Sequence, residues 1–151
     1  MLDVALARAS EGFRVFPLGP GGKTPTIKGW QDAATTDPAR IRAWWWDPVM
    51  EVPLDYNVGV ATGRGLVVVD VDMKNGKDGE KSLRLLEMLF CDLPATHEVR
   101  TPSGGRHLYF RSANPVRSRI GFMTGIDIKG EGGFVVAEGS VVDGGVYARI
   151  G

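Results

Sequence analysis

The chain has 151 residues, of which 43% are apolar and 24% charged, and its 18 Lys and Arg residues balance 18 Asp and Glu residues. This length suits one compact domain, and the neutral balance gives no global attraction to nucleic acid or to a membrane surface. The single cysteine, Cys91, excludes an internal disulfide and a multi-cysteine zinc site, as expected in a reducing, cytoplasmic compartment. No window of the sequence is apolar enough to predict a membrane span, so we expect no membrane partner.

The first third of the chain contains two predicted helices around a short strand. Apolar spacing predicts a helix over residues 1–14 and a strand over residues 14–18, followed by a turn-rich segment. Asp37 and Pro38 predict the N-cap and the first position of a second helix. That helix carries three adjacent tryptophans, which cannot all face one core, so we expect at least one of them to be exposed.

The rest of the chain is rich in predicted strands. Strands are expected over residues 57–63 and 65–72, and residues 79–93 form an amphipathic helix that Pro94 closes. Further strands are expected over residues 96–102, 107–112, 125–130, 132–140 and 146–150. This order predicts a single α+β domain over residues 1–151, with helices covering a mixed or antiparallel sheet.

The predicted strand over residues 65–72 ends in two aspartates. Asp70 and Asp72 lie two positions apart, so their side chains share one face of the strand at a spacing of about 7 Å. Carboxylates at this spacing repel each other, and a divalent cation such as Mg²⁺ or Mn²⁺ relieves the repulsion. The alternative is a pair of aspartates that cap the following turn, and the pattern alone leaves both interpretations open.

A second group of polar residues surrounds a predicted turn between two strands. Ser103, Gly104 and Gly105 form this turn, and glycines allow backbone N–H groups to approach a phosphate closely. Arg106 and His107 follow the turn and carry side chains that bond phosphate oxygens. An ordinary hairpin with a surface histidine is the alternative.

A third carboxylate, Asp127, lies in the middle of a predicted strand. Its two isoleucine neighbours point to the other face, and a lone carboxylate in this setting needs an ion pair or a metal ion. The stretch from Arg100 to Lys129 holds six Lys and Arg residues and one acid, which favours an anionic ligand. A salt bridge for the aspartate and a solvated strand face for the basic stretch are the alternatives.

In this order the motifs resemble the primase–polymerase (Prim-Pol) domain of the archaeo-eukaryotic primase superfamily, found at the N-terminus of phage, plasmid and prophage replication proteins. The resemblance runs through the stretches GFRVFPLGPGGKTPTIKGWQDAATTD, NVGVATGRGLVVVDVD, TPSGGRHLYFR and GIDIKGEGGFVVAEGS, and it covers nearly the whole chain. It implies an RRM-like sheet core and a DNA primase or polymerase that uses Mg²⁺ or Mn²⁺. It also implies that the chain is the N-terminal part of a longer replication protein, with a fused or separate helicase as a partner.

The resemblance also implies roles for particular residues. The catalytic metals would be bound by Asp70, Asp72 and Asp127. The incoming dNTP or NTP would be bound by the turn and its neighbours, namely Ser103, Gly104, Gly105, Arg106, His107 and Lys129. The candidates for binding a single-stranded DNA template are basic residues, namely Arg100, Arg111, Arg117, Arg119, Lys23 and Lys28.

Two other classes of function remain open from the sequence. A metal-dependent glycosyltransferase also uses an Asp-x-Asp pair, with Mn²⁺, to hold a nucleoside diphosphate, although it usually needs a longer chain. A non-catalytic module could bind single-stranded nucleic acid without a metal ion, although the presence of all three aspartates argues against it.

Overall fold

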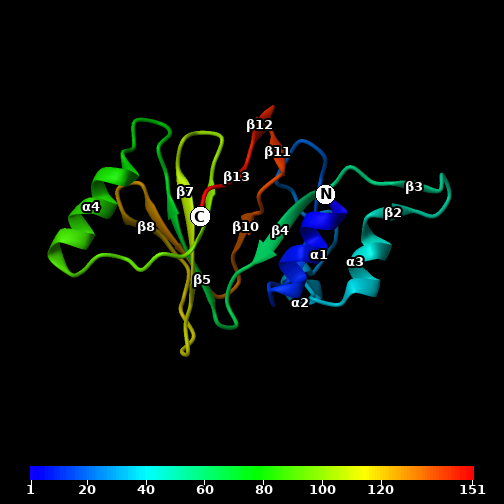
Figure 1. The fold of residues 1–151 in the computed structure, drawn as a ribbon, viewed down its shortest axis with the longest axis horizontal. Coiled ribbons are helices and arrows are strands. Elements are labelled where there is room, and N and C mark those ends of the chain that lie inside the picture. The colour runs from blue at the N-terminus through cyan, green and yellow to red at the C-terminus, as the bar shows by residue number, and fades with distance from the viewer. The chain divides into compact units, whose positions relative to one another are not determined.

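A computed structural model describes all 151 residues, which form two compact units (Figure 1). The first unit comprises Met1–Ala61 and Phe134–Tyr147, and the second comprises Thr62–Gly133 and Ala148–Gly151. Every pairing between the named strands is antiparallel, and helices accompany the strands in both units. The predicted α+β class is therefore confirmed. No helix combines the length and the apolar composition that crossing a membrane requires.

The first unit is built on the three-stranded sheet β1-β4-β10. Its core includes Phe16, whose ring stacks on Trp30 at 4.6 Å and meets Phe134 edge-on at 5.3 Å. The Phe16 ring occupies the space that a Cβ at Gly59 would need, so a side chain there would collide with it. The elements of this unit are α1 (Leu2–Ser10), β1 (Val15–Leu18), α2 (Trp30–Ala33), α3 (Pro38–Trp44), β2 (Trp46–Asp47), β3 (Val52–Pro53), β4 (Asn57–Ala61), β10 (Phe134–Val136), β11 (Val141–Val142) and β12 (Gly145–Val146).

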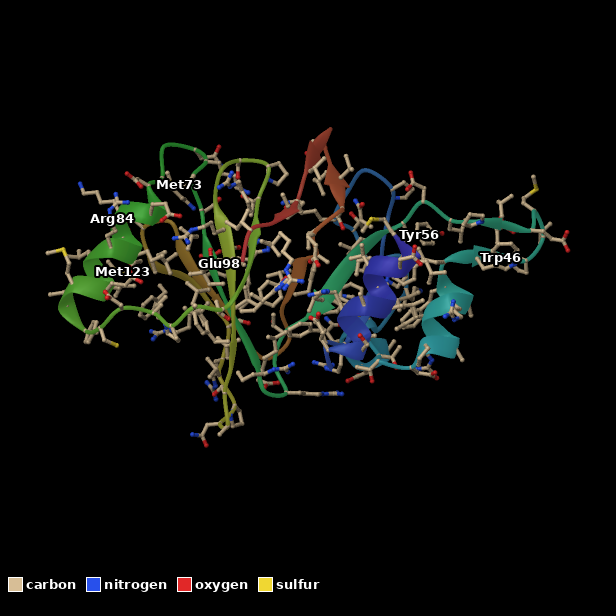
Figure 2. All side chains as sticks on the ribbon, in the orientation of Figure 1. Trp46, Tyr56, Met73, Arg84, Glu98 and Met123 are labelled. Carbon is tan, nitrogen blue, oxygen red and sulfur yellow. The ribbon has the colours of Figure 1, made fainter.

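The start of α3 and the tryptophans that follow agree with the sequence. The Asp37 carboxylate accepts a hydrogen bond from the Ala39 backbone N–H at 3.0 Å, which is the predicted N-cap. Trp45 is buried and its indole N–H donates to the Tyr56 carbonyl at 3.0 Å, whereas Trp46 is 45% exposed (Figure 2). The expectation that the three tryptophans do not all face the core is confirmed.

The second unit is built on a six-stranded sheet in the order β13-β6-β7-β5-β9-β8, with one helix on one of its faces (Figure 1). Leu83 of the helix packs against a buried cluster that contains Val71, Leu108 and Ile126 from three adjacent strands. The central strand, β5, lies between β7 and β9. The elements of this unit are β5 (Leu66–Val71), α4 (Gly79–Leu89), β6 (His97–Arg100), β7 (Arg106–Arg111), β8 (Arg119–Met123), β9 (Ile126–Lys129) and β13 (Ala148–Arg149).

Candidate active site

The register of the central strands places three polar side chains in one row. Asp70 of β5 lies directly opposite His107 of β7 on one side and Asp127 of β9 on the other. Directly opposed residues in antiparallel strands point to the same face, with Cα atoms about 4.5–5.5 Å apart. Lys129 joins this face because it lies opposite Val68, two positions before Asp70. The sheet therefore brings together residues that the sequence places in three separate motifs.

Positive groups and hydrogen-bond donors surround the carboxylates of this row. The Nε2 atom of His107 lies 3.6 Å from Oδ1 of Asp70, which is too long for a hydrogen bond. The Nζ atom of Lys129 lies 3.8 Å from Oδ2 of Asp127. The Gly121 backbone N–H donates to Oδ1 of Asp127 at 2.6 Å. Only the last of these contacts is a short hydrogen bond.

Asp72 lies one residue beyond the end of β5, and its main chain is held from two sides. Its N–H donates to the Gly125 carbonyl at 2.7 Å, and its carbonyl accepts from the Gly79 N–H at 3.0 Å. The nearest positive group to its carboxylate is Nζ of Lys74, at 3.9 Å. The sequence analysis missed Lys74 as a neighbour of the Asp72 carboxylate and Gly121 as a hydrogen-bond donor to Asp127. Lys74 could have been found from the sequence, because it carries the opposite charge and follows Asp72 by two positions.

The carboxylates influence one another electrostatically. The pKa of Asp70 rises from 3.8 to about 6, chiefly because the side chain is buried; the charges of Asp72 and Asp127 contribute to the rise, and Lys129 partly opposes it. Ionising Asp70 therefore costs free energy in the folded protein without a cation. A positive charge placed between the three side chains would lower the electrostatic energy of this arrangement.

The three aspartates fit a divalent cation in the chemistry of their oxygen donors, but their side chains do not converge on one point. Carboxylate oxygens are ligands that Mg²⁺ and Mn²⁺ prefer, and Asp70, Asp72 and Asp127 come from one strand end and its neighbouring strand. No three acidic, His or Cys side chains converge closely enough to coordinate a metal ion in this structure. The contacts of 3.6–3.9 Å to His107, Lys74 and Lys129 are too long for hydrogen bonds, and a cation could replace them. The residues thus supply the oxygen donors, and each of the three carboxylates has a basic side chain within 4 Å.

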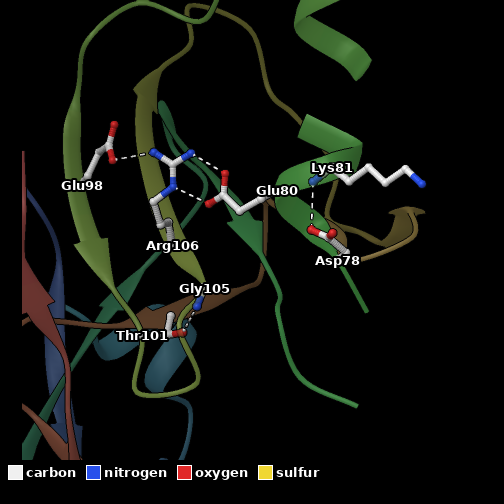
Figure 3. Close-up of polar contacts among 7 residues, drawn as sticks. All are labelled: Asp78, Glu80, Lys81, Glu98, Thr101, Gly105 and Arg106. Carbon is white, nitrogen blue, oxygen red and sulfur yellow. Dashed lines mark hydrogen bonds and ion pairs between the residues drawn. The ribbon is translucent and has the colours of Figure 1, made fainter. Parts of the chain in front are cut away.

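The turn between β6 and β7 is closed by its own hydrogen bonds. The Gly105 N–H donates to Oγ1 of Thr101 at 3.0 Å (Figure 3), and the Thr101 N–H donates to the Gly105 carbonyl at 2.9 Å. Ser103 is exposed, with its Oγ 3.2 Å from Oγ1 of Thr101. Gly104 has a φ of +86° and open space where a Cβ would stand, so its backbone is accessible to a ligand. Gly105, in contrast, packs against β5, because a Cβ there would lie 2.1 Å from the Val71 carbonyl oxygen.

Arg106 lies on the opposite face of the sheet from His107. It pairs with Val71 of β5 in the register, so its side chain points toward α4 rather than toward Asp70. Its Nε and Nη2 atoms donate to the Glu80 carboxylate at 2.6 and 2.9 Å, and Nη1 donates to Glu98 at 2.9 Å (Figure 3). Arg106 and His107 therefore point to opposite faces of the sheet, because they are consecutive strand residues, and a phosphate contact by Arg106 stays a prediction.

These contacts make Arg106 a link between α4 and two strands. The hydrogen bonds to Glu80 raise the pKa of Arg106 above its ordinary value, and burial opposes the shift. Replacing Arg106 with Ala should cost about 1.5–3 kcal/mol, because charged hydrogen bonds are lost and Glu80 and Glu98 keep no partner. We expect the melting temperature to fall by about 3–12 °C. Arg84→Ala is the matched control, since Arg84 is exposed on α4 (Figure 2). Equal melting temperatures for the two variants would contradict this role.

The basic residues considered for the template belong to both units, and those on the sheet of the second unit point to both of its faces. Arg111 lies opposite Leu66 and points to the face of Asp70, whereas Arg100 lies opposite Arg106 and points to the face of α4. Arg117 and Arg119 lie in an exposed segment, and the Arg119 guanidinium is 5.6 Å from the Phe122 ring centre. Lys23 and Lys28 belong to the first unit, between β1 and α2. Each group needs its own experimental test.

An apolar pocket of about 180 Å³ opens on the α4 side of the sheet. Its lining includes Leu83, Phe90 and Ile128, and it contains none of the three aspartates. The polar row and this pocket therefore lie on opposite faces of the same sheet. The pocket offers a ligand almost no polar group, whereas the row offers two carboxylates and an imidazole.

Comparison with known proteins agrees with the motifs. The sequence matches the family described as Prim-Pol, bifunctional DNA primase/polymerase, N-terminal, over residues 5–151. No curated protein matches the chain. The family match extends over both units and includes all three aspartates of the row and strand end. The chain therefore belongs to the Prim-Pol family of bifunctional DNA primase/polymerase domains.

Proposed function

We propose that this chain is a template-directed nucleotidyltransferase, which starts or extends a primer on single-stranded DNA with the help of divalent cations. The observation that carries the proposal is the row formed by Asp70, His107 and Asp127 across three adjacent strands. Family membership supports the same reading. The expected partners are the DNA template, a dNTP or NTP, and a fused or separate helicase, in the cytoplasm.

The chemistry divides between charge neutralisation and positioning. Two Mg²⁺ or Mn²⁺ ions, when bound, supply neutralisation of the triphosphate and activation of the primer 3′-hydroxyl. Asp70, Asp72 and Asp127 would hold these ions by their carboxylates. Positioning and electrostatics account for most of the acceleration in such reactions, so the chain needs no dedicated general base.

The nucleotide is bound beside the carboxylates by the same face of the sheet. His107 is nearly buried, and its Nε2 atom is on the side of Asp70, so it would donate to a phosphate oxygen bound at this face of the sheet. Lys129 and the exposed Ser103 hydroxyl supply further donors, and Gly104, whose N–H donates to the Thr101 carbonyl at 3.0 Å, leaves open space for the phosphate beside them. Gly105 and Arg106 hold the turn and β7 in place: Gly105 packs against β5, and Arg106 binds Glu80 of α4.

Replacing His107 with Ala should weaken dNTP binding about tenfold to a hundredfold, because a charged phosphate contact contributes about 1.5–3 kcal/mol. Calorimetry with Mg²⁺ present measures the change, and a melting curve separates it from unfolding. His97→Ala is the matched control, because His97 lies on the same face but packs edge-on against Tyr109. If His107→Ala binds dNTP as tightly as the wild type, His107 has no role in nucleotide binding.

The function itself is tested by incubating the protein with single-stranded DNA, labelled dNTP or NTP, and Mn²⁺, with and without a primer. We expect incorporation that depends on the template and stops with EDTA. Sugar transfer from a UDP- or GDP-sugar, without incorporation, would instead identify a glycosyltransferase. Metal-independent binding of single strands without any incorporation would identify a non-catalytic binding module.

Template binding should depend on salt through the exposed arginines. Each phosphate that is neutralised adds about 0.7 to the slope of log affinity against log salt for a single strand. Reversing the charge of Arg117 and Arg119 to Glu should therefore flatten this slope, while nucleotide binding stays unchanged. Fluorescence anisotropy over a salt series measures the slope, with Arg84→Glu as control. An unchanged slope would place the template elsewhere.

A further inference from the structure

Two glycines that lie far apart in the sequence pack against the main chain of Asp72. Gly79 is the first residue of α4, and Gly125 lies in the turn between β8 and β9. A Cβ at Gly79 would lie 2.4 Å from the Gly125 carbonyl oxygen and 2.7 Å from that of Asp72. A Cβ at Gly125 would lie 2.7 Å from the Gly79 Cα atom. Rotation of a side chain cannot relieve these contacts, because every atom in them belongs to the backbone.

Hydrogen bonds join the same three residues, which we call the glycine junction: Asp72, Gly79 and Gly125. The Asp72 N–H donates to the Gly125 carbonyl at 2.7 Å, and the Gly79 N–H donates to the Asp72 carbonyl at 3.0 Å. Gly125 stands two residues before Asp127. The first of these bonds therefore ties the end of β5 to the beginning of the strand that carries the third carboxylate.

Backbone conformation explains only one of the two glycines. Gly125 has a φ of +73°, which disfavours any side chain, but Gly79 does not have a positive φ. An alanine at the first position of α4 would ordinarily favour the helix. Gly79 is therefore required by the closeness of Asp72 and Gly125 alone, and a side chain there would push these two backbones apart.

We propose that Gly79 and Gly125 are positioning residues, which set the place of the Asp72 carboxylate relative to Asp127 and thereby the affinity of the cation site. This inference rests on the proposed function, since it concerns the same three aspartates. Groups that orient metal ligands typically change metal affinity about 10- to 100-fold when they are altered. A merely structural role would lower stability and leave the affinity of the folded protein unchanged.

The test is a calorimetric titration of the protein with Mn²⁺, without nucleotide or DNA. We expect Gly79→Ala and Gly125→Ala to bind Mn²⁺ about 10- to 100-fold more weakly than the wild type at a temperature where all are folded. The matched control is Gly76→Ala. Gly76 lies in the turn between Asp72 and Gly79 and has a φ of +74°, but nothing lies within 4 Å of the position of its Cβ. It carries the same backbone strain without the crowding, so its affinity should equal that of the wild type.

A second measurement needs no variant and applies even if the alanine variants fail to fold. Hydrogen exchange followed by NMR on the metal-free wild type should show a protected Asp72 amide, because the junction is formed before the cation binds. An Asp72 amide that exchanges freely until Mg²⁺ is added would overturn the inference.

Failure of the inference and failure of the function give different results. If the wild type binds Mn²⁺, Asp127→Asn abolishes binding, and both glycine variants bind like Gly76→Ala, the site stands and the positioning role is refuted. If the wild type does not bind Mn²⁺, or if Asp127→Asn binds it equally well, the cation site itself is refuted and the inference falls with it.

Discussion

Asp127→Asn is expected to lower the rate of nucleotide transfer about 100- to 1,000-fold at saturating Mn²⁺, the size of effect seen when a group that stabilises transition-state charge is lost. Asn keeps the shape of the side chain and can still accept the hydrogen bond from the Gly121 N–H, but it loses the negative charge that holds a cation. Primer extension under single-turnover conditions measures the rate, and circular dichroism shows whether the fold is kept.

The matched control for this variant is Asp92→Asn, because Asp92 is exposed and lies outside the row. Asp70 and Asp72 should respond as Asp127 does, since the proposal gives the three carboxylates one task. Extension near the wild-type rate by Asp127→Asn, or by Asp72→Ala at saturating Mn²⁺, would show that the reaction does not use these carboxylates together.

Asp70→Asn should stabilise the metal-free protein, which is the opposite of its effect on activity. The pKa of Asp70 rises from 3.8 to about 6 in the folded state, which corresponds to a cost of up to about 3 kcal/mol for the ionised side chain at pH 7. Asn carries no charge and avoids this cost. Thermal melts in EDTA at pH 7 should therefore show a melting temperature higher by up to about 6–12 °C.

The pH dependence of this gain has a definite sign. Because the folded pKa lies above the unfolded one, the folded state binds the additional proton between about pH 4 and pH 6, so the wild type regains stability as the pH falls through this range. The advantage of Asp70→Asn should shrink over the same range. Mg²⁺ should stabilise the wild type more than the variant, because only the folded wild type binds it tightly. A variant less stable than the wild type at pH 7 in EDTA would contradict the cost of ionising the buried Asp70.

Local features of the fold could be predicted from the sequence. Asp37 and Pro38 mark the start of α3, and the apolar run before Asp70 marks β5, because caps and strand patterns depend on neighbouring residues. The helix predicted over residues 79–93 ends at Leu89 instead, with Phe90 to Leu93 left exposed. The strand β8 was missed because its residues are almost all exposed and show no alternation of buried and exposed positions.

The candidate site could be predicted only in part, because its geometry depends on strand register. Asp70 and Asp127 are far apart in the sequence, and no local pattern states that β9 pairs with β5 so as to place them opposite each other. The same register explains why Arg106, which follows the glycine turn, points to the other face of the sheet than His107. The glycine junction is likewise invisible in the sequence, since it joins backbones from three separate segments.

The most direct test of the cation site is a crystal structure of the protein grown with Mn²⁺ and a non-hydrolysable dNTP analogue. Anomalous scattering identifies the position of Mn²⁺ without reference to any assumed ligand. We expect Mn²⁺ on the face of β5 that carries Asp70, bound by carboxylate oxygens of Asp70, Asp72 and Asp127, with the triphosphate next to His107. Mn²⁺ bound elsewhere, with the three aspartates still held by their lysine and histidine partners, would contradict the account.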